Sequence, residues 1–134
     1  EGTGFKGNVD SCDPNYSFHH IGTSNRLYVF EAPIDLLSYI TLHPQDWQEH
    51  NYVALCGVGG HAMIWMLEQH PRLRQVSFCL DNDEAGHKAS GRLKSQLTEK
   101  GYVSERLISQ TKDWNDDLTA AAQQRHSGLG MKMV

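Results

Sequence analysis

The chain has 134 residues, of which 39% are hydrophobic and 21% are charged. These proportions are typical of one globular domain with a single core. The formal net charge of −4 excludes a surface that coats nucleic acid through general basicity. No apolar run reaches the length of a membrane span, so we expect no membrane contact. Three cysteines without CxxC spacing argue against a disulfide framework and favour a cytoplasmic protein.

The first part of the chain carries no clear chemistry. The sequence begins at Glu1 rather than at methionine, and we expect it to be a piece of a longer protein. Residues 1–25 are rich in glycine and polar residues, with two short runs at 5–9 and 16–21 around a turn-like segment. We interpret this segment as an N-terminal β-hairpin extension or as the end of a preceding domain.

The first motif with chemical interest follows a short apolar run, Leu27–Phe30, which predicts a strand that ends at Glu31. Pro33 suits the first turn of a helix, and helical apolar spacing continues to about His43. Because helical side chains lean toward the helix N-terminus, Asp35 should point to the same edge as Glu31.

A second strand is predicted at residues 52–56, and the helix after it stops before Pro71. Between them lies a glycine-rich turn. Gly59 and Gly60 could bring backbone amides close to a phosphate at the helix N-terminus. A plain strand-to-helix turn is the interpretation that we favour, since this glycine pattern alone is weak.

The third strand, predicted at residues 76–80, stops abruptly at acidic residues. Asp81 and Asp83 stand at i and i+2 on the turn that leaves this strand. Two carboxylates in that position suit a hard divalent cation such as Mg²⁺. Asp83 could instead cap the following helix, and for any single one of these acids capping is the simpler explanation.

The helix that follows should end near Gly101, and its surface carries Lys88 and Arg92 one turn apart. This pair is either a solvated face, with Lys88 bonded to Glu84, or a basic strip that contacts phosphates. The two interpretations stay open at this point.

A last strand is predicted at residues 103–108, nearer the edge of the sheet because it is less apolar. An acidic segment over residues 112–117 precedes an alanine-rich helix to about Arg125, and residues 127–134 are expected to be a flexible tail. The alternation of strands and helices predicts an α/β fold with a mainly parallel four-stranded sheet flanked by helices. In such a sheet ligands bind at the carboxyl ends of the strands.

The acids are concentrated where this fold would bring them together. Eight of the 16 acids fall in three short segments, each after a predicted strand, and their mutual repulsion would be offset by a cation. These eight are Glu31, Asp35, Asp81, Asp83, Glu84, Asp113, Asp116 and Asp117.

Three motifs in this order resemble the Toprim domain, the catalytic fold of bacterial-type primases, topoisomerases and certain nucleases. They are a strand-terminal glutamate with an aspartate four residues later (Glu31, Asp35), a DxD motif before a glycine-containing helix (Asp81, Asp83), and a closing Lys-Asp-Trp-Asn-Asp segment at residues 112–116. The resemblance is strongest to the primase-like Toprim proteins of bacterial plasmids and mobile elements. It implies a Rossmann-like Toprim catalytic domain at residues 26–126.

The resemblance also implies roles for individual residues. Asp81 and Asp83 would bind Mg²⁺ or Mn²⁺, with Asp35 and Asp113 completing the cluster, and Glu31 would act as general acid and base or join the metal shell. Asn115 and Asp116 would bind or orient the metal. Contacts to phosphate or nucleic acid are expected, on weaker grounds, from Lys88, Arg92, Lys112, Gly59 and Gly60.

The implied activity is Mg²⁺-dependent nucleotidyl transfer on DNA or RNA with nucleoside triphosphates, most simply primer synthesis in DNA replication. A helicase or another replication protein would be the partner. A Toprim nuclease, a topoisomerase fragment and a catalytically idle Toprim binding module are alternatives within the fold. A phospho-accepting receiver domain is an alternative of another class, although a receiver would carry a side-by-side acidic pair where this chain has Glu31 alone.

Overall fold

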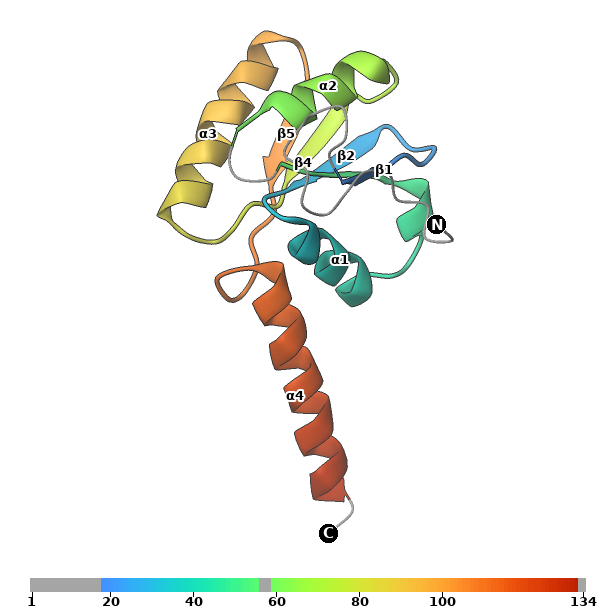
Figure 1. Ribbon diagram of the computed structural model, residues 1–134, viewed down its shortest axis with the longest axis vertical. Helices are drawn as coiled ribbons and strands as arrows, with labels where there is room; N and C mark the ends of the chain where they lie inside the picture. The colour runs from blue at the N-terminus through green and yellow to red at the C-terminus, as the bar shows by residue number, and fades with distance from the viewer. Residues whose placement is uncertain (1–17, 56–58, 133–134) are drawn as a thin grey trace.

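A computed structural model describes residues 18–55 and 59–132 of the chain. The described residues form a five-stranded sheet with helices on both faces (Figure 1). In chain order the strands are β1 (His19–His20), β2 (Arg26–Phe30), β3 (Asn51–Ala54), β4 (Gln75–Phe78) and β5 (Val103–Arg106). The helices are α1 (Pro33–Leu42), a short 3-10 helix η2 (Trp47–Glu49), α2 (His61–Gln69), α3 (Glu84–Glu99) and α4 (Trp114–Lys132).

The sheet has the order β1-β3-β2-β4-β5, and all of its strands except β1 run parallel. The predicted four-stranded parallel sheet is therefore confirmed. The added strand β1 pairs antiparallel with β3, with His19 opposite Val53. It falls within the predicted run at residues 16–21, whereas the run at residues 5–9 lies outside the described residues, so the hairpin stays a prediction.

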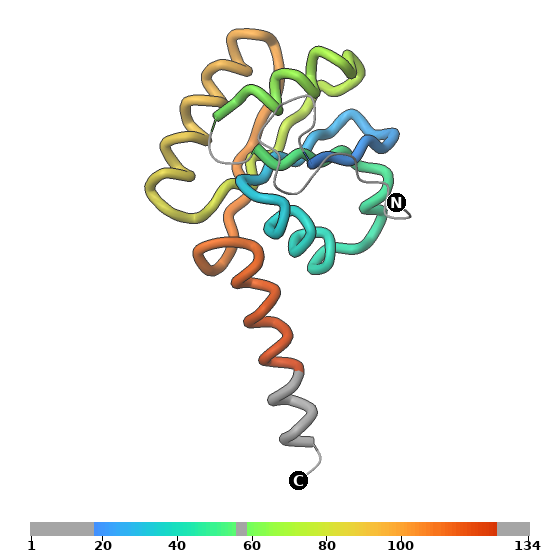
Figure 2. The backbone as a smooth tube through the Cα atoms, viewed as in Figure 1, coloured from blue at the N-terminus to red at the C-terminus, as the bar shows by residue number. Residues whose placement is uncertain are grey.

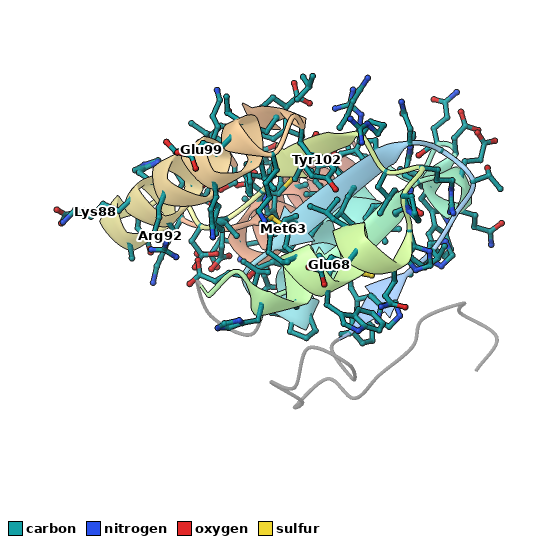
Figure 3. All side chains as sticks on the ribbon, turned by 90° about the horizontal axis from the view of Figure 1, so that it is seen from above. Met63, Glu68, Lys88, Arg92, Glu99 and Tyr102 are labelled. Carbon is teal, nitrogen blue, oxygen red and sulfur yellow. The ribbon has the colours of Figure 1, made fainter. Side chains whose placement is uncertain are left out.

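Two hydrophobic layers hold the helices to the sheet. On one face Leu27 and Val29 of β2 pack with Met63 of α2 and Leu93 of α3. On the other face Phe30 packs in the cluster that includes Leu36, Tyr52 and Trp114. Figure 3 shows α3 and α2 lying side by side over the sheet, with Met63 directed inward. Alternation of side chains along β2 produces this division, as expected for a strand covered on both faces.

The predicted helix ends agree with the structure except at the last helix. We expected that helix to stop near Arg125, but α4 continues to Lys132. The flexible tail at residues 127–134 stays a prediction. The glycines at 128 and 130 lower helix propensity without removing a backbone hydrogen bond, which explains why they do not end the helix. The proposed domain limits remain predictions.

The helix α4 begins beside α1 and then leads away from the sheet (Figures 1 and 2). Within the described residues, no helix is both long enough and apolar enough to cross a bilayer.

Candidate functional site

The carboxyl ends of the parallel strands bring together acids from three distant segments. Glu31 follows β2, Asp81 follows β4, and Asp113 precedes α4. Asp35 reaches the same edge from the first turn of α1. The placement follows from the topology, because β2 and β4 are adjacent and parallel and therefore end at one edge.

Three of these acids form a compact cluster. One carboxylate oxygen from each of Asp35, Asp81 and Asp113 lies within 4.8 Å of the other two. Asp35 is only 5% exposed, whereas the other two are half-buried. We refer to Asp35, Asp81 and Asp113 as the acid cluster. Its members are 78 positions apart at the extremes (113 − 35), so only the folded chain assembles it.

The position of Asp81 is set by close packing of α3. A Cβ atom at Gly86 would overlap the carbonyl oxygen of Asp81, so a glycine is required for this approach. The same carbonyl accepts a hydrogen bond of 2.9 Å from Arg106 Nη2. The backbone amide of Asp81 donates to Glu31 Oε1 at 3.4 Å, which places Glu31 at the border of the cluster.

Asp113 and Asp35 are held by the start of α4. The indole nitrogen of Trp114 donates to the carbonyl oxygen of Cys79 at 3.0 Å, which ties α4 to the end of β4. Asp113 Oδ1 accepts from the backbone amide of Asp116 at 2.8 Å and so caps the helix. The amide of Asn115 donates to Asp35 Oδ1 at 3.2 Å. Asp113 therefore both caps α4 and belongs to the acid cluster.

In the acid cluster, burial and mutual repulsion outweigh the nearby positive charges, so the pKa values of the acids are raised. Burial raises the pKa of Asp35 to about 6, and the carboxylates of Asp113, Asp81 and Glu31 act in the same direction. Burial, followed by Asp113 and Asp83, raises the pKa of Asp81 against the opposing effect of Lys112 and Arg106. Burial and the Asp81 carboxylate likewise raise the pKa of Glu31. A bound cation would reverse these shifts.

One carboxylate oxygen of the cluster is unsatisfied in the described part of the folded chain. Asp81 Oδ1 is buried and has no hydrogen-bond partner among the described residues. A buried carboxylate oxygen without a partner is costly, and a divalent cation with oxygen preference would satisfy it. The three-oxygen donor set therefore fits Mg²⁺ or Mn²⁺, which take few protein ligands and keep waters and substrate oxygens.

Asp83, Asn115 and Asp116 lie next to this cluster without joining it. Asp83 Oδ1 accepts from the amide of Gly86 at 2.7 Å and caps α3, as the simpler explanation of this residue anticipated. Asn115 Oδ1 accepts from Ser38 Oγ at 3.3 Å, and Asp116 is exposed. Their roles at a metal remain predictions.

Of the residues expected to contact phosphate, Lys88 and Arg92 point outward from α3 (Figure 3). Lys88 forms an exposed ion pair of 3.2 Å with Glu84, in agreement with the solvated-face interpretation. Lys112 is exposed, and its positive charge acts on Glu31 and Asp81.

The two glycines at the start of α2 differ from each other. A Cβ atom at Gly60 would crowd Leu93 at 2.7 Å, which supports a packing role in the strand-to-helix turn. Gly59 is exposed. Phosphate contacts by Gly59, Gly60, Lys88, Arg92 and Lys112 stay predictions.

One residue at the site, Arg106, escaped the sequence reasoning, and another, Asp117, has a different role from the one expected. Arg106 donates to the carbonyl oxygens of Leu80 and Asp81, and so positions the DxD turn. Its signal was its alternation with the exposed Val103 and Glu105, which turns Arg106 inward. Asp117 was counted among the clustered acids, but it accepts from the amides of residues 110 and 111 and closes the loop before α4.

Comparison with known proteins gives relatives whose activity is not described. The chain is 27% identical over 96 residues to an uncharacterised protein of Mycoplasma genitalium, covering 69% of this chain and 41% of that protein. It is 28% identical over 127 residues to an uncharacterised protein of a Bacillus anthracis plasmid, covering 83% of this chain and 37% of that protein. The chain thus spans less than half the length of these curated relatives.

Among solved structures, the fold is similar to that of a primase. The primase fragment of the bacteriophage T7 primase-helicase protein superposes with a TM-score of 0.63 and 17% identity, over 88% of this chain and 49% of that chain. A second match, with a TM-score of 0.57 and 18% identity over 77% of this chain and 52% of that one, comes from the complex of T7 lagging-strand DNA polymerase with primase domains bound to an RNA/DNA hybrid and dTTP.

These similarities agree with the resemblance that the three acidic motifs indicated. The family described as Toprim-like matches residues 28–118, a span that begins in β2, ends in α4 and contains the whole acid cluster. The chain belongs to the Toprim-like family.

Proposed function

We propose that this chain is the catalytic module of a primase-like enzyme that transfers nucleotides onto nucleic acid with the help of Mg²⁺ or Mn²⁺. The observation that carries the proposal is the acid cluster, in which three carboxylates lie together and one of them, Asp81, has a buried Oδ1 without a hydrogen-bond partner among the described residues. Such a concentration of negative charge on a parallel-sheet edge is suited to phosphate chemistry only when a cation is present.

In this proposal Asp35, Asp81 and Asp113 hold the cation. When bound, the cation neutralises charge on the phosphates and aligns the attacking and leaving oxygens. Trp114 and Arg106 keep the cluster assembled, since they bond the ends of β4 to the start of α4 and to β5. Asp83 is confined to the rim of the site by its bond to Gly86.

Glu31 is the candidate general base. One of its oxygens accepts from the amide of Asp81, which leaves the second oxygen to take the proton from a hydroxyl nucleophile. The pKa of Glu31 is raised, and a base whose pKa lies nearer to neutrality transfers protons more effectively. In nucleotidyl transfer, a 3′-hydroxyl oxygen would attack the α-phosphorus and pyrophosphate would leave.

Support for polymerisation over cleavage comes from the solved relatives, which are primase domains, one set of them bound to an RNA/DNA hybrid and dTTP. A Toprim nuclease would use the same acids, and a topoisomerase would add a tyrosine from another domain. The family match favours all three over a receiver domain.

The plasmid relative agrees with a mobile-element protein. A helicase or polymerase is the partner that we propose, because the similar solved structures come from a primase-helicase protein and from a complex with a polymerase. We place the protein in the cytoplasm on the basis of its cysteine pattern.

The first test measures Mn²⁺ binding to this chain by electron paramagnetic resonance. Asp81→Asn should abolish saturable binding because it removes the ligand with the orphaned oxygen. Glu84→Gln is the matched control, since Glu84 is an exposed acid three residues away. Equal Mn²⁺ affinity in wild type and Asp81→Asn would overturn the metal site.

The second test measures activity in the longest natural protein that contains this chain. Template-dependent incorporation of labelled nucleotides should be lost in Asp81→Asn and in Glu31→Gln and retained in Glu84→Gln. Cleavage of a labelled strand without incorporation would assign the site to a nuclease. Full incorporation in both site variants would refute the proposed chemistry.

A further inference from the structure

Arg106 and Lys112 both place positive charge beside the acid cluster, and they differ in what their charged atoms contact. The guanidinium of Arg106 is occupied by carbonyl groups, since Nη1 donates to Leu80 at 2.8 Å and Nη2 donates to Asp81 at 2.9 Å. The side chain of Lys112 is exposed and forms no ion pair within the described part of the chain. Lys112 therefore carries the positive charge at this site that is free to meet a ligand.

The main chain of Lys112 is fixed against the turn that carries the DxD motif. Its carbonyl oxygen accepts from the amide of Asn82 at 2.6 Å, and the side-chain amide of Asn82 donates to the carbonyl oxygen of Ser109 at 3.0 Å. The next residue along the chain, Asp113, belongs to the acid cluster. The side chain of Lys112 thus starts from a fixed point next to the cluster, and its flexible stem and three donors allow it to follow a ligand there.

The charge of Lys112 acts on one side of the acid cluster. Burial raises the pKa of Glu31 and of Asp81, and the charge of Lys112 opposes this rise in both residues. The pKa of Asp35 is raised by burial and by other carboxylates, and no cation is among the principal causes. Asp35 is also the buried member of the cluster, whereas Glu31 is half-buried and Lys112 is exposed. The accessible side of the cluster is therefore the side of Glu31 and Lys112.

We infer that Lys112 contacts the phosphate group that the cation of the acid cluster would hold, on the side of the cluster where Glu31 lies. A phosphate oxygen is a suitable partner for an ammonium group, which binds it as a point charge. The inference rests on the proposed function and deepens it, because it selects one residue among those expected to contact phosphate. Of the others, Lys88 is already paired with Glu84, and Arg92 points outward from α3 (Figure 3).

A contact of this kind predicts opposite effects of one substitution on two ligands. The ammonium group of Lys112 repels a divalent cation and attracts a phosphate. Lys112→Met should therefore raise the affinity for Mn²⁺ alone by about two- to fivefold. It should lower the affinity for a phosphate at the cation-loaded site by about tenfold or more. If Lys112 only stabilised the loop before α4, the same substitution would weaken the binding of both ligands.

The test measures the two affinities separately on this chain. Electron paramagnetic resonance gives the affinity for Mn²⁺ alone. Amide chemical shifts of the ¹⁵N-labelled chain, recorded in excess Mg²⁺, give the affinity for three probes: inorganic pyrophosphate, dTTP and a short oligodeoxythymidylate. Pyrophosphate should produce saturable shifts at residues 31, 81 and 111–113. The phosphate belongs either to a nucleoside triphosphate or to the backbone of a strand, and the larger loss in Lys112→Met, for dTTP or for the oligonucleotide, identifies the source.

Two further variants separate the charge of Lys112 from the presence of a long side chain. Lys112→Arg keeps the positive charge and should retain most of the phosphate affinity. Lys100→Met is the matched control, because Lys100 is an exposed lysine at the opposite end of α3 from Asp83, and both affinities should stay as in wild type. The variants at Lys112 should fold as wild type does, since its side chain is exposed and its bond to Asn82 is made by the main chain.

The inference is overturned if Lys112→Met binds the phosphate probes as tightly as Lys100→Met does, or if it weakens Mn²⁺ and phosphate binding together. A wild-type chain that binds Mg²⁺ but none of the probes also overturns it and leaves the metal site in place. Failure of the proposed function has a different signature. A chain that binds no divalent cation rejects the metal site and the inference together. Phosphate binding that depends on Lys112, in a protein without transfer activity, would retain the contact and reject the enzyme.

Discussion

Two groups of polar side chains lie on the same sheet, and they differ in whether negative charges are paired with positive charges inside the group. The acid cluster at the carboxyl ends of the strands contains carboxylates alone. Nearer the amino ends of β2 and β4, Arg26 donates to Glu105 Oε2 at 2.6 Å, to Ser77 Oγ at 2.8 Å and to Gln75 Oε1 at 2.8 Å. We call Arg26, Gln75, Ser77 and Glu105 the Arg26 network.

The two groups differ in how far their charges and hydrogen bonds are satisfied by the chain itself. In the Arg26 network every charge has an internal counter-charge, and Ser77 Oγ also donates to Glu105 at 2.8 Å. In the acid cluster the pKa values of Asp35 and Asp81 are raised and Asp81 Oδ1 is unsatisfied among the described residues. The first group is complete as a structural element. A bound cation would supply the counter-charge that the second group lacks among its own members.

We expect the largest effect from Gly86→Ala, because this substitution should disrupt the acid cluster and leave the Arg26 network in place. The new methyl group would overlap the carbonyl oxygen of Asp81, and α3 could not keep its approach to the strand end. We expect a loss of about 3 kcal/mol or more in unfolding free energy, together with loss of Mn²⁺ binding. Urea denaturation measures the former. Gly91→Ala is the control: its added methyl group meets no neighbour, and its stability should not fall.

The next largest effect should come from adding Mg²⁺, which should stabilise the chain through the acid cluster and not through the Arg26 network. Mg²⁺ at about 100 times its dissociation constant should stabilise the wild-type chain by about 2.7 kcal/mol. The same gain is expected in Glu105→Gln, which alters only the Arg26 network. It should be absent in Asp81→Asn. Thermal unfolding with and without Mg²⁺ gives all three values, and a full Mg²⁺ gain in Asp81→Asn would contradict a cation at the cluster.

Without metal, the stability should depend on pH, and this effect should be smaller than the stabilisation by Mg²⁺. The pKa of Asp35 is about 6 in the folded chain, against an ordinary value of 3.8. The folded state therefore binds more protons than the unfolded state between these values, so stability increases as the pH falls through this window. We expect a gain of about 1–2 kcal/mol from pH 7.5 to pH 4.5 in EDTA.

Asp35→Asn should reduce this gain, because it removes the carboxyl group with the raised pKa. Asp117 cannot produce the same trend, since its pKa is lowered and its contribution to stability disappears only at more acidic pH. Unfolding curves at three pH values would test the sign. Stability that rises toward pH 7.5 in wild type would contradict the assignment.

The smallest expected effect belongs to Arg26→Met. This change removes a partly exposed ion pair and two hydrogen bonds from the guanidinium to neutral oxygens, so we expect a loss of about 1–2 kcal/mol in stability. Mg²⁺ affinity should stay as in wild type, because the network does not contact the acid cluster through any hydrogen bond of the described residues. A concurrent loss of Mg²⁺ binding would show that the two groups are coupled.

The sequence predicted the framework of the site because that framework depends on strand order and direction. Parallel strands end at one edge, so residues that follow β2 and β4 had to meet. The DxD spacing of Asp81 and Asp83, followed by a helix that contains a glycine, indicated a site at the same edge of the sheet. The strand β1 falls within the run predicted at residues 16–21, but its antiparallel pairing with β3 was not predicted, since a two-residue strand has no periodicity to detect.

The directions of the side chains at the site could not be predicted from the sequence pattern. Asp81 and Asp83 looked equivalent, yet Asp83 turns to the α3 backbone and Asp81 to the cluster, and this choice depends on the packing of Gly86. Asp35 was expected at the edge, but its burial is a consequence of α4 docking against α1. Arg106 resembled an ordinary residue of an edge strand because its partners are carbonyl groups, which every sequence contains.

The hydrogen bond from Trp114 to Cys79 anchors the start of α4 at the end of β4. The same short stretch contains Asp113, which precedes the helix, and Asn115, whose amide donates to Asp35. A displacement of the start of α4 relative to β4 would therefore change the spacing of the carboxylate oxygens of the acid cluster.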